Sequence, residues 1–154
     1  MQVDEALWAF VDAFERAGVP YAVTGDLALH LFGYPHARPR LELAVGTDAR
    51  GIAEVLGFTE VRSTGRVSLY ARDSLTVAII RAAIHNPLPA FVDGRIVSVL
   101  DPAHRLPLDE DDIALLDEAT VTLTAADAGP WLDFMSRIAP APRGNTNADE
   151  PFEL

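Results

Sequence analysis

Apolar residues recur along the first hundred positions at the spacings of one amphipathic helix and several short strands. The N-terminal ones are three or four residues apart, as on one face of a helix: Val3, Leu7, Phe10, Val11 and Phe14. This pattern predicts a helix over Val3–Ala17. Gly18 follows it and supplies the residue that most often ends a helix.

Shorter apolar runs between turn residues predict strands. They span Tyr21–Val23, Arg40–Val45, Phe58–Arg62, Val67–Arg72, Leu75–Arg81 and Arg95–Leu100. An Asp93-Gly94 pair precedes the last of them and is typical of a tight hairpin turn. Asp73-Ser74 is a second turn signal, between the fourth and fifth runs.

Four further segments have helical character, and their order along the chain predicts the fold class. They are Asp26–Phe32, Ala49–Leu56, a helix opened by Asp109–Asp112, and Thr124–Ile138. Helices and strands alternate first, strands then follow as hairpins, and helices close the chain. We therefore expect an α+β domain with a mixed sheet, helices packed on it and a C-terminal helical pair. The domain should span residues 1–138, and the proline-rich, polar residues 139–154 should form a disordered tail.

Composition limits the classes of function. The chain has 154 residues, 49% of them hydrophobic, which suits one globular domain. No apolar run approaches the roughly 20 residues that span a bilayer, and the acidic N-terminus does not resemble a secretory signal. The net charge is -11 and every basic residue is an arginine, a balance that disfavours binding to nucleic acid. We expect a cytoplasmic protein with no membrane or nucleic-acid partner.

The segment between the first two strands combines glycines with polar residues at regular positions. It reads Gly25-Asp26-Leu27-Ala28-Leu29, then Gly33-Tyr34-Pro35-His36-Ala37-Arg38, then Arg40-Leu41-Glu42-Leu43. This arrangement resembles the nucleotidyltransferase superfamily, which includes polymerase beta and small bacterial transferases of toxin–antitoxin and abortive-infection systems. The resemblance extends over roughly Val11 to Leu100.

The resemblance implies a specific chemistry. Members of that superfamily place two acids two residues apart on the second strand and a third acid on a later strand. These acids hold two magnesium ions about 3.5–4 Å apart, which bind the attacking and leaving oxygens of a phosphoryl displacement. The glycine turn lets the backbone approach the triphosphate of the nucleotide.

Several of these residues are replaced in this chain. Arg40 stands where the first acid is expected, Glu42 where the second is expected, and Ala78 where the third is expected. Asp26 brings a negative charge to the turn where phosphate would bind. The lysine that assists some relatives is absent, because the chain has no lysine.

The replacements suggest an internal substitute for the metal ions. We expect Asp26, Arg40 and Glu42 to form an ion-paired cluster that fills the former metal site. The alternative is that the three side chains are solvated and unrelated. We predict no confident catalytic residue and no metal ligand. The predicted ligand-binding residues are Gly25, Asp26, Arg38, Arg40 and Glu42.

Three functions follow as alternatives. The first is a catalytically degenerate, nucleotidyltransferase-like binding or regulatory module without a cofactor, acting with a protein partner or as a homodimer. The second is an active transferase that uses Mg²⁺ and a nucleoside triphosphate, with Asp26, Glu42 and a third acid such as Asp73. The third is an unrelated α+β interaction protein. The histidines have no spacing typical of metal ligands, and Asp109–Asp112 is expected to be a solvated helix turn.

Overall fold

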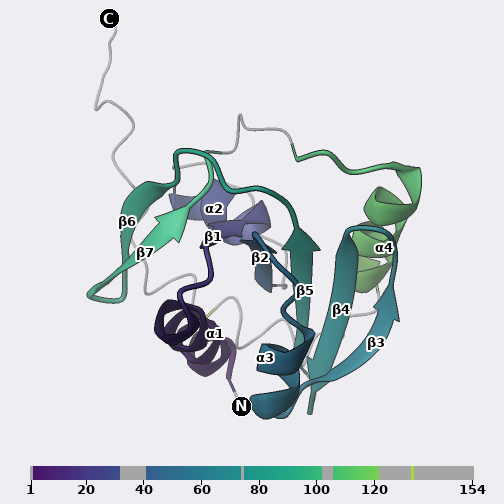
Figure 1. The fold of residues 1–154 in the computed structure, drawn as a ribbon, viewed down its shortest axis with the longest axis horizontal. Coiled ribbons are helices and arrows are strands. Elements are labelled where there is room, and N and C mark those ends of the chain that lie inside the picture. The colour runs from purple at the N-terminus through teal and green to yellow at the C-terminus, as the bar shows by residue number, and fades with distance from the viewer. Residues whose placement is uncertain (1, 32–40, 74, 102–105, 122–132, 134–154) are drawn as a thin grey trace, which may run out of the picture.

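The computed structural model describes residues 2–31, 41–73, 75–101, 106–121 and 133. The helices are α1 (Val3–Ala17), α2 (Gly25–Leu31), α3 (Arg50–Val55) and α4 (Glu110–Val121). The strands are β1 (Tyr21–Thr24), β2 (Leu41–Val45), β3 (Thr59–Ser63), β4 (Val67–Arg72), β5 (Leu75–Arg81), β6 (Leu88–Val92) and β7 (Arg95–Val99). Figure 1 shows these elements along the chain.

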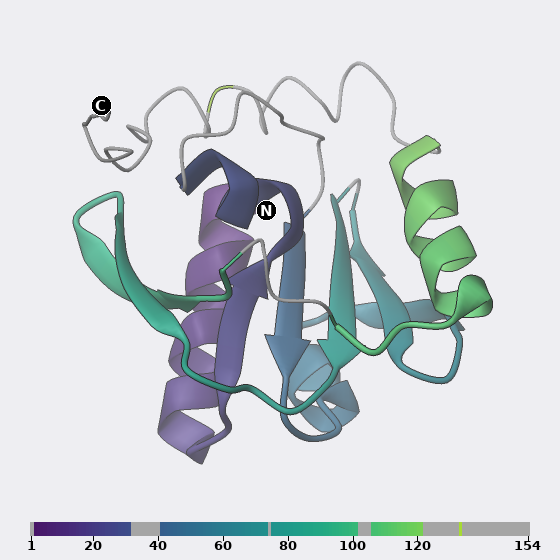
Figure 2. The same ribbon diagram turned by 90° about the horizontal axis from the view of Figure 1, so that it is seen from above.

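The strands form one seven-stranded mixed sheet in the order β3-β4-β5-β2-β1-β7-β6. Neighbours are antiparallel except for the β2–β5 and β1–β7 pairs, which are parallel. In Figure 2, the β6–β7 hairpin projects at one end of the sheet and α4 lies at the other. The predicted α+β class with a mixed sheet is therefore confirmed.

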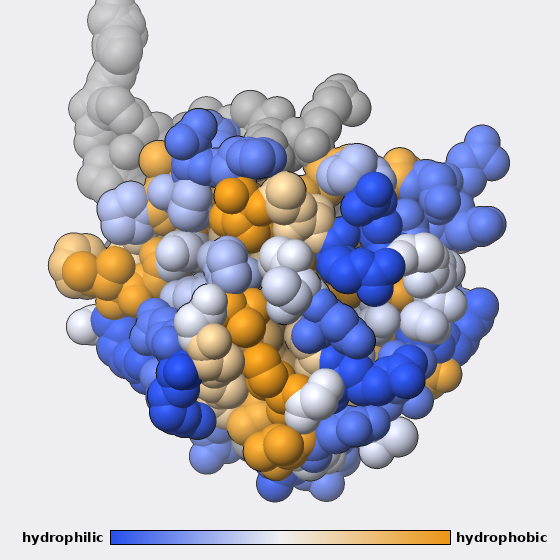
Figure 3. All heavy atoms as spheres, viewed as in Figure 1, coloured by the Kyte–Doolittle hydropathy of each residue, from blue (hydrophilic) through white to orange (hydrophobic). Residues whose placement is uncertain are grey.

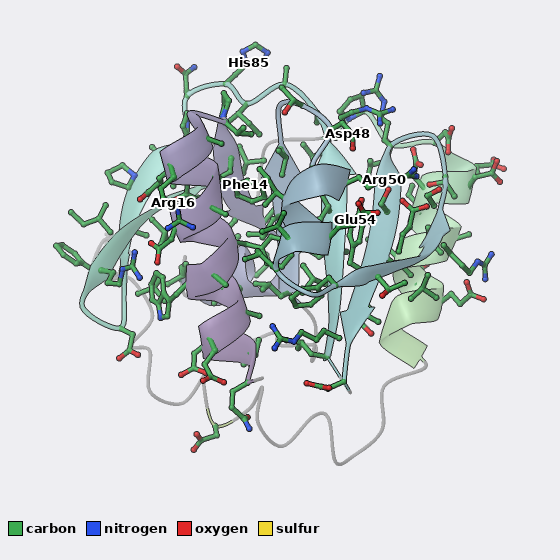
Figure 4. The ribbon with its side chains drawn as sticks, turned by 60° about the horizontal axis from the view of Figure 1, so that its bottom comes forward. Phe14, Arg16, Asp48, Arg50, Glu54 and His85 are labelled. Atoms are coloured by element: carbon green, nitrogen blue, oxygen red, sulfur yellow. The ribbon has the colours of Figure 1, made fainter. Side chains whose placement is uncertain are left out.

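Helix α1 packs its apolar stripe against one face of the sheet. Leu7, Phe10 and Phe14 are completely buried there, in one cluster with side chains of β1, β2 and β5. Figure 4 shows Phe14 on the inner side of α1 and Arg16 on its outer side. The helix ends at Gly18, whose φ of 67° is a left-handed conformation that glycine adopts without steric penalty.

The opposite face of the sheet carries a second apolar cluster under α4. Leu115 and Leu116 of α4 are buried there with Val67, Leu69 and Ile80. Alternation along the strands explains the two clusters, because successive side chains of a strand point to opposite faces. Both faces of the central strands are thus covered, and all five residues of β2 are buried.

Asp112 connects the start of α4 to the turn between β3 and β4. Its side chain is 1% exposed and accepts hydrogen bonds from the Thr64 hydroxyl (2.5 Å) and from the amides of Arg66 (3.1 Å) and Asp109 (3.1 Å). The Asp109 carboxylate accepts a bond from the Asp112 amide in return (2.9 Å). The expectation of a solvated turn over Asp109–Asp112 is therefore wrong for Asp112, because the β3–β4 turn covers it.

Most predicted elements are confirmed to within one residue at each described end, and α1, β4 and β5 have the predicted bounds. Strand β6 was not predicted. The helix expected over Thr124–Ile138 and the tail over 139–154 lie outside the described residues. In the part of the chain that the structure describes, no helix has the length and apolar character needed to cross a bilayer.

Candidate functional site

Three neighbouring strands place Thr24, Glu42 and Ala78 in one row across the centre of the sheet. Thr24 of β1 is opposite Glu42 in the antiparallel β1–β2 pair, and Glu42 is opposite Ala78 in the parallel β2–β5 pair. Residues in register on neighbouring strands project from the same face, with the strands roughly 4.8 Å apart. The face is the one under α4, because Ala78 belongs to the same cluster as Leu115. Position 78 is therefore next to Glu42, as the resemblance requires of the third acid, but it holds a methyl group.

Glu42 is buried against the turn that starts α2. It is 4% exposed. Gly25 has a φ of +70°, and a Cβ at this position would lie 2.6 Å from the carboxylate carbon of Glu42 and 2.8 Å from each carboxylate oxygen. Only glycine fits this conformation and this contact without a shift. The carboxylate thus lies directly against the backbone of the turn to which the resemblance assigns triphosphate binding.

A pocket of about 260 Å³ opens on this face, at the end of β1. Among the residues that the structure describes, its lining includes Thr24, Gly25, Ala28, Leu29, Glu42, Ile80, Asp101, Leu106 and Leu108. Within this described part, the ionisable groups are the carboxylates of Glu42 and Asp101, and most of the remaining wall is aliphatic. The pocket therefore combines an acidic region with apolar walls.

Asp101 was missed in the sequence, because its place in the site depends on how β7 pairs in the sheet. It lies two residues after Val99, and Val99 is opposite Val23 in the parallel β1–β7 pair. Because parallel strands end at the same edge of a sheet, Asp101 emerges beside Gly25. The missing knowledge was the pairing of β7 with β1, which joins segments more than seventy residues apart in the sequence.

The structure brings together Gly25 and Glu42 of the predicted site. Arg38, Arg40 and the side chain of Asp26 lie outside the described residues. The ion-paired cluster of Asp26, Arg40 and Glu42 therefore stays a prediction. Of the four histidines, His85 is exposed, in the connection between β5 and β6.

The described residues do not fit the two-ion site that the resemblance implies. Within the described ranges, no three His, Asp or Glu side chains gather closely enough to hold a metal ion. Glu42 has the methyl group of Ala78 beside it, not a second carboxylate. Asp73 lies in the β4–β5 turn, at the opposite end of β5 from Ile80, which lines the pocket. Asp73 is thus too distant to replace the third acid.

Comparisons with known proteins were made for both sequence and fold. No protein-family model matches the sequence, and no curated protein matches it. Among solved structures, the antibiotic-resistance factor ANT(2'')-Ia has a similar fold. Its solution structure is 16% identical over 89% of this chain and 94% of that chain, with a TM-score of 0.52. Its crystal structure with adenylyl-2''-tobramycin is 15% identical over 86% of this chain and 97% of that chain, with a TM-score of 0.51.

A third solved structure is the lincosamide antibiotic adenylyltransferase LnuA with bound lincomycin. It is 14% identical over 88% of this chain and 98% of that chain, with a TM-score of 0.45. The two ANT(2'')-Ia structures show that the chain has a nucleotidyltransferase-like fold. An unrelated fold would lack a sheet that joins the strands predicted over Tyr21–Val23 and Arg40–Val45. In the structure, the corresponding strands β1 and β2 pair directly.

Proposed function

We propose that this protein has lost metal-dependent nucleotidyl transfer and acts as a binding or regulatory module with a nucleotidyltransferase-like fold. The observation that carries the proposal is the pairing of Glu42 with Ala78. A pair of Mg²⁺ ions needs several hard oxygen ligands in a near-octahedral arrangement. Among the described residues, the pocket offers the carboxylates of Glu42 and Asp101, and the position expected for the third acid holds only the methyl group of Ala78. This set is too small for two ions.

The contact between Gly25 and Glu42 supports the same conclusion. The Glu42 carboxylate lies against the Gly25 backbone, where a Cβ would approach it to 2.6 Å. A phosphate entering this turn would meet a negative charge at short range, in a region where Glu42 is 4% exposed. If the predicted Arg40 pairs with Glu42, this repulsion is offset, and the side chains that fill the turn are then what hinders a phosphate. The binding role then belongs to the pocket beside Glu42.

Nucleotide incorporation is the direct test. The purified protein is incubated with Mg²⁺ and each labelled nucleoside triphosphate, and we expect neither incorporation nor pyrophosphate release. A thermal-melting measurement needs no acceptor substrate, and we expect no increase in Tm with Mg²⁺ and nucleotide, because a ligand stabilises only the state that binds it. Incorporation that disappears in Glu42→Ala would overturn the proposal.

A substitution at position 78 tests the reason for the loss. Ala78→Asp places a second buried carboxylate about 5 Å from Glu42, and we expect a destabilisation of roughly 3 kcal/mol or more. Millimolar Mn²⁺ should restore part of this loss, because a divalent cation neutralises two adjacent carboxylates.

Ala53→Asp is the matched control for this variant. Ala53 is also completely buried, but it belongs to the apolar cluster on the face of the sheet opposite to Glu42. Its substitution should destabilise the protein without recovery by Mn²⁺. If Mn²⁺ stabilises the unmodified protein as much as it stabilises the Ala78→Asp variant, the site still binds metal and the proposal fails.

The active alternative depends on Asp101. Its presence in the pocket with Glu42 gives an enzyme two carboxylates on one side of the cavity, to which the predicted Asp26 would add a third. An Asp101→Asn variant separates the two functions. It would abolish incorporation in an active transferase, and it would leave an inactive protein's response to Mg²⁺ and nucleotide unchanged.

A further inference from the structure

The two edges of the sheet differ in how well they are protected against pairing with another strand. The edge strand β3 carries Glu60 and Arg62, and its register with β4 shifts between these two residues, which is a β-bulge or irregularity. Arg62 also forms an ion pair with Glu118 of α4. Charges, bulges, prolines and covering elements are the usual devices that block an edge, and β3 combines a charged surface, a bulge and a contact with α4. The β3 edge is therefore protected.

The other edge strand, β6, has neither a charge nor a register shift, and Pro89 is its one edge-blocking residue. Its sequence, Leu88–Val92, contains no ionisable side chain, in a chain whose net charge is -11. Phe91 is 71% exposed, and Ile96, directly opposite it on β7, is 60% exposed. Figure 3 shows apolar side chains on the left of the molecule, where Figure 1 places the β6–β7 hairpin. An apolar cross-strand pair is thus exposed beside an edge that is open in the sense that no other strand of the described residues pairs with it.

Backbone hydrogen bonds show which strand each residue of β7 faces. The amide of Leu100 donates to the carbonyl oxygen of Val23 in β1 (2.9 Å). The amide of Ser98 donates in the same direction, to the hydroxyl of Tyr21 (3.5 Å). Because the backbone groups of successive residues in a strand point to opposite sides, the alternate residues of β7 face β6.

The same alternation gives the orientation of β6. Ala90 is opposite Val97, one of the residues that face β6, so the backbone groups of Ala90 face β7. The backbone groups of Pro89 and Phe91 then face the open edge. Proline is accepted at this position because it has no amide hydrogen to leave unpaired. The edge therefore presents the amide and carbonyl of Phe91 and the carbonyl of Pro89 to a partner.

We propose that β6 pairs antiparallel with β6 of a second copy of this chain, centred on Phe91, so that two sheets join in a reversible homodimer. A two-fold axis through this point places Phe91 opposite Phe91, and each amide donates to the other's carbonyl. The two aromatic rings lie on the same face and bury each other together with the flanking Ile96 side chains. Two acidic chains repel at most approaches, and this uncharged strand lets them meet with the least repulsion.

The oligomeric state is measured by sedimentation equilibrium over a wide range of protein concentration. We expect the average mass to rise from monomer to dimer. Phe91→Lys should weaken the dimer at least about tenfold, since it brings two like charges directly opposite each other. Val61→Lys is the matched control, because Val61 is 58% exposed on the opposite edge strand β3, and it should behave as the unmodified protein. A chain that stays monomeric at all concentrations overturns the proposal.

The absence of cysteine makes a register-specific test available. In the proposed dimer, the two copies of Phe91 have Cα atoms about 5.5 Å apart, within the reach of a disulfide. The two copies of Ile96 lie on the next strands, about 14 Å apart. Phe91→Cys should therefore form a disulfide-linked dimer under mild oxidation, and Ile96→Cys should not. Equal cross-linking of the two variants would indicate random collision and would overturn the pairing.

Discussion

At the scale of single residues, the contact between Gly25 and Glu42 can be separated from the left-handed conformation of the glycine. Gly18 has almost the same φ, 67° against 70°, and a Cβ there would meet nothing within 4 Å. Gly18→Ala should cost about 1 kcal/mol in the free energy of unfolding, the penalty for a side chain in this conformation. Gly25→Ala should cost about 3 kcal/mol or more, since its Cβ also collides with the Glu42 carboxylate. Urea unfolding of both variants measures the difference.

Removing the carboxylate checks that Glu42 is the cause. In a Glu42→Ala background, Gly25→Ala should cost about as much as Gly18→Ala, because the collision is gone. If Gly25→Ala and Gly18→Ala are equally destabilising in the unmodified chain, the carboxylate moves aside easily. The turn would then remain open to a phosphate, against the proposed loss of function.

The residues of the site were predictable only where a local motif identified them. Gly25, Glu42 and Ala78 followed from the resemblance, and the β2–β5 register places the last two side by side. Asp101 was missed because its position depends on the β1–β7 pair, which no local pattern indicates. Arg40 remains a prediction. A site residue can thus be identified from a local sequence motif. The residues that surround it depend on strand pairs that join distant segments of the chain.

At the scale of elements, Asp112 makes the stability of the contact between α4 and the β3–β4 hairpin depend on pH. Burial on its own would raise the pKa of Asp112, but hydrogen bonds from Thr64 and from the amides of Arg66 and Asp109 outweigh it and lower this pKa below the usual value. The folded state therefore has the lower pKa, and ionised Asp112 stabilises it above about pH 4. This stabilisation is lost as the pH falls through the folded-state pKa.

The variant Asp112→Asn should therefore lower the free energy of unfolding by about 2 kcal/mol at pH 7. The difference from the unmodified protein should shrink as the pH falls through the lowered folded-state pKa of Asp112, because the carboxylate then becomes protonated. Asp111→Asn is the matched control, because Asp111 is exposed in the same helical turn, and it should change stability by only a few tenths of a kcal/mol. Urea unfolding at several pH values measures both. A difference for Asp112→Asn that does not depend on pH would contradict the role of its charge.

The elements show where sequence patterns suffice and where they fail. Helix α1 was predicted with the correct bounds because its periodicity is strong and Gly18 ends it. Strand β6 was missed because its exposed residues do not alternate clearly and two prolines, Pro87 and Pro89, argue against a central strand. It forms because the Asp93-Gly94 turn, with φ values of 51° and 83°, folds the chain back onto β7.

At the scale of the whole molecule, the order of the strands could not be derived from periodicity. The central pairs β2–β5 and β1–β7 join segments far apart in the sequence, and in β2 the residues on both faces are buried. Such strands carry no alternating pattern that fixes a neighbour. The resemblance of a few residues around Gly25 to the nucleotidyltransferase superfamily supplied the expected fold. The solved structures with TM-scores of 0.52 and 0.51 agree with that fold.

The charge of the whole molecule leads to a prediction about salt. Surface ion pairs such as Arg50–Glu60 and Arg95–Asp12 each contribute little, because solvent screens them. The net charge of -11 acts over the entire folded chain and disfavours its compact state. Raising NaCl from about 10 mM to 200 mM shortens the screening length from about 30 Å to below 10 Å, so we expect Tm to increase.

The salt dependence also separates general repulsion from specific contacts. Calorimetric melts in NaCl and in the chloride of a larger monovalent cation, at equal ionic strength, should give the same increase in Tm if screening is the cause. A decrease in Tm would mean that ion pairs such as Arg95–Asp12 outweigh the repulsion.

The same excess of negative charge predicts no retardation of duplex DNA in a gel at low salt, because the protein releases few counterions from the phosphates. Retardation that weakens as salt is added would instead require a local basic surface strong enough to overcome the charge of the whole molecule.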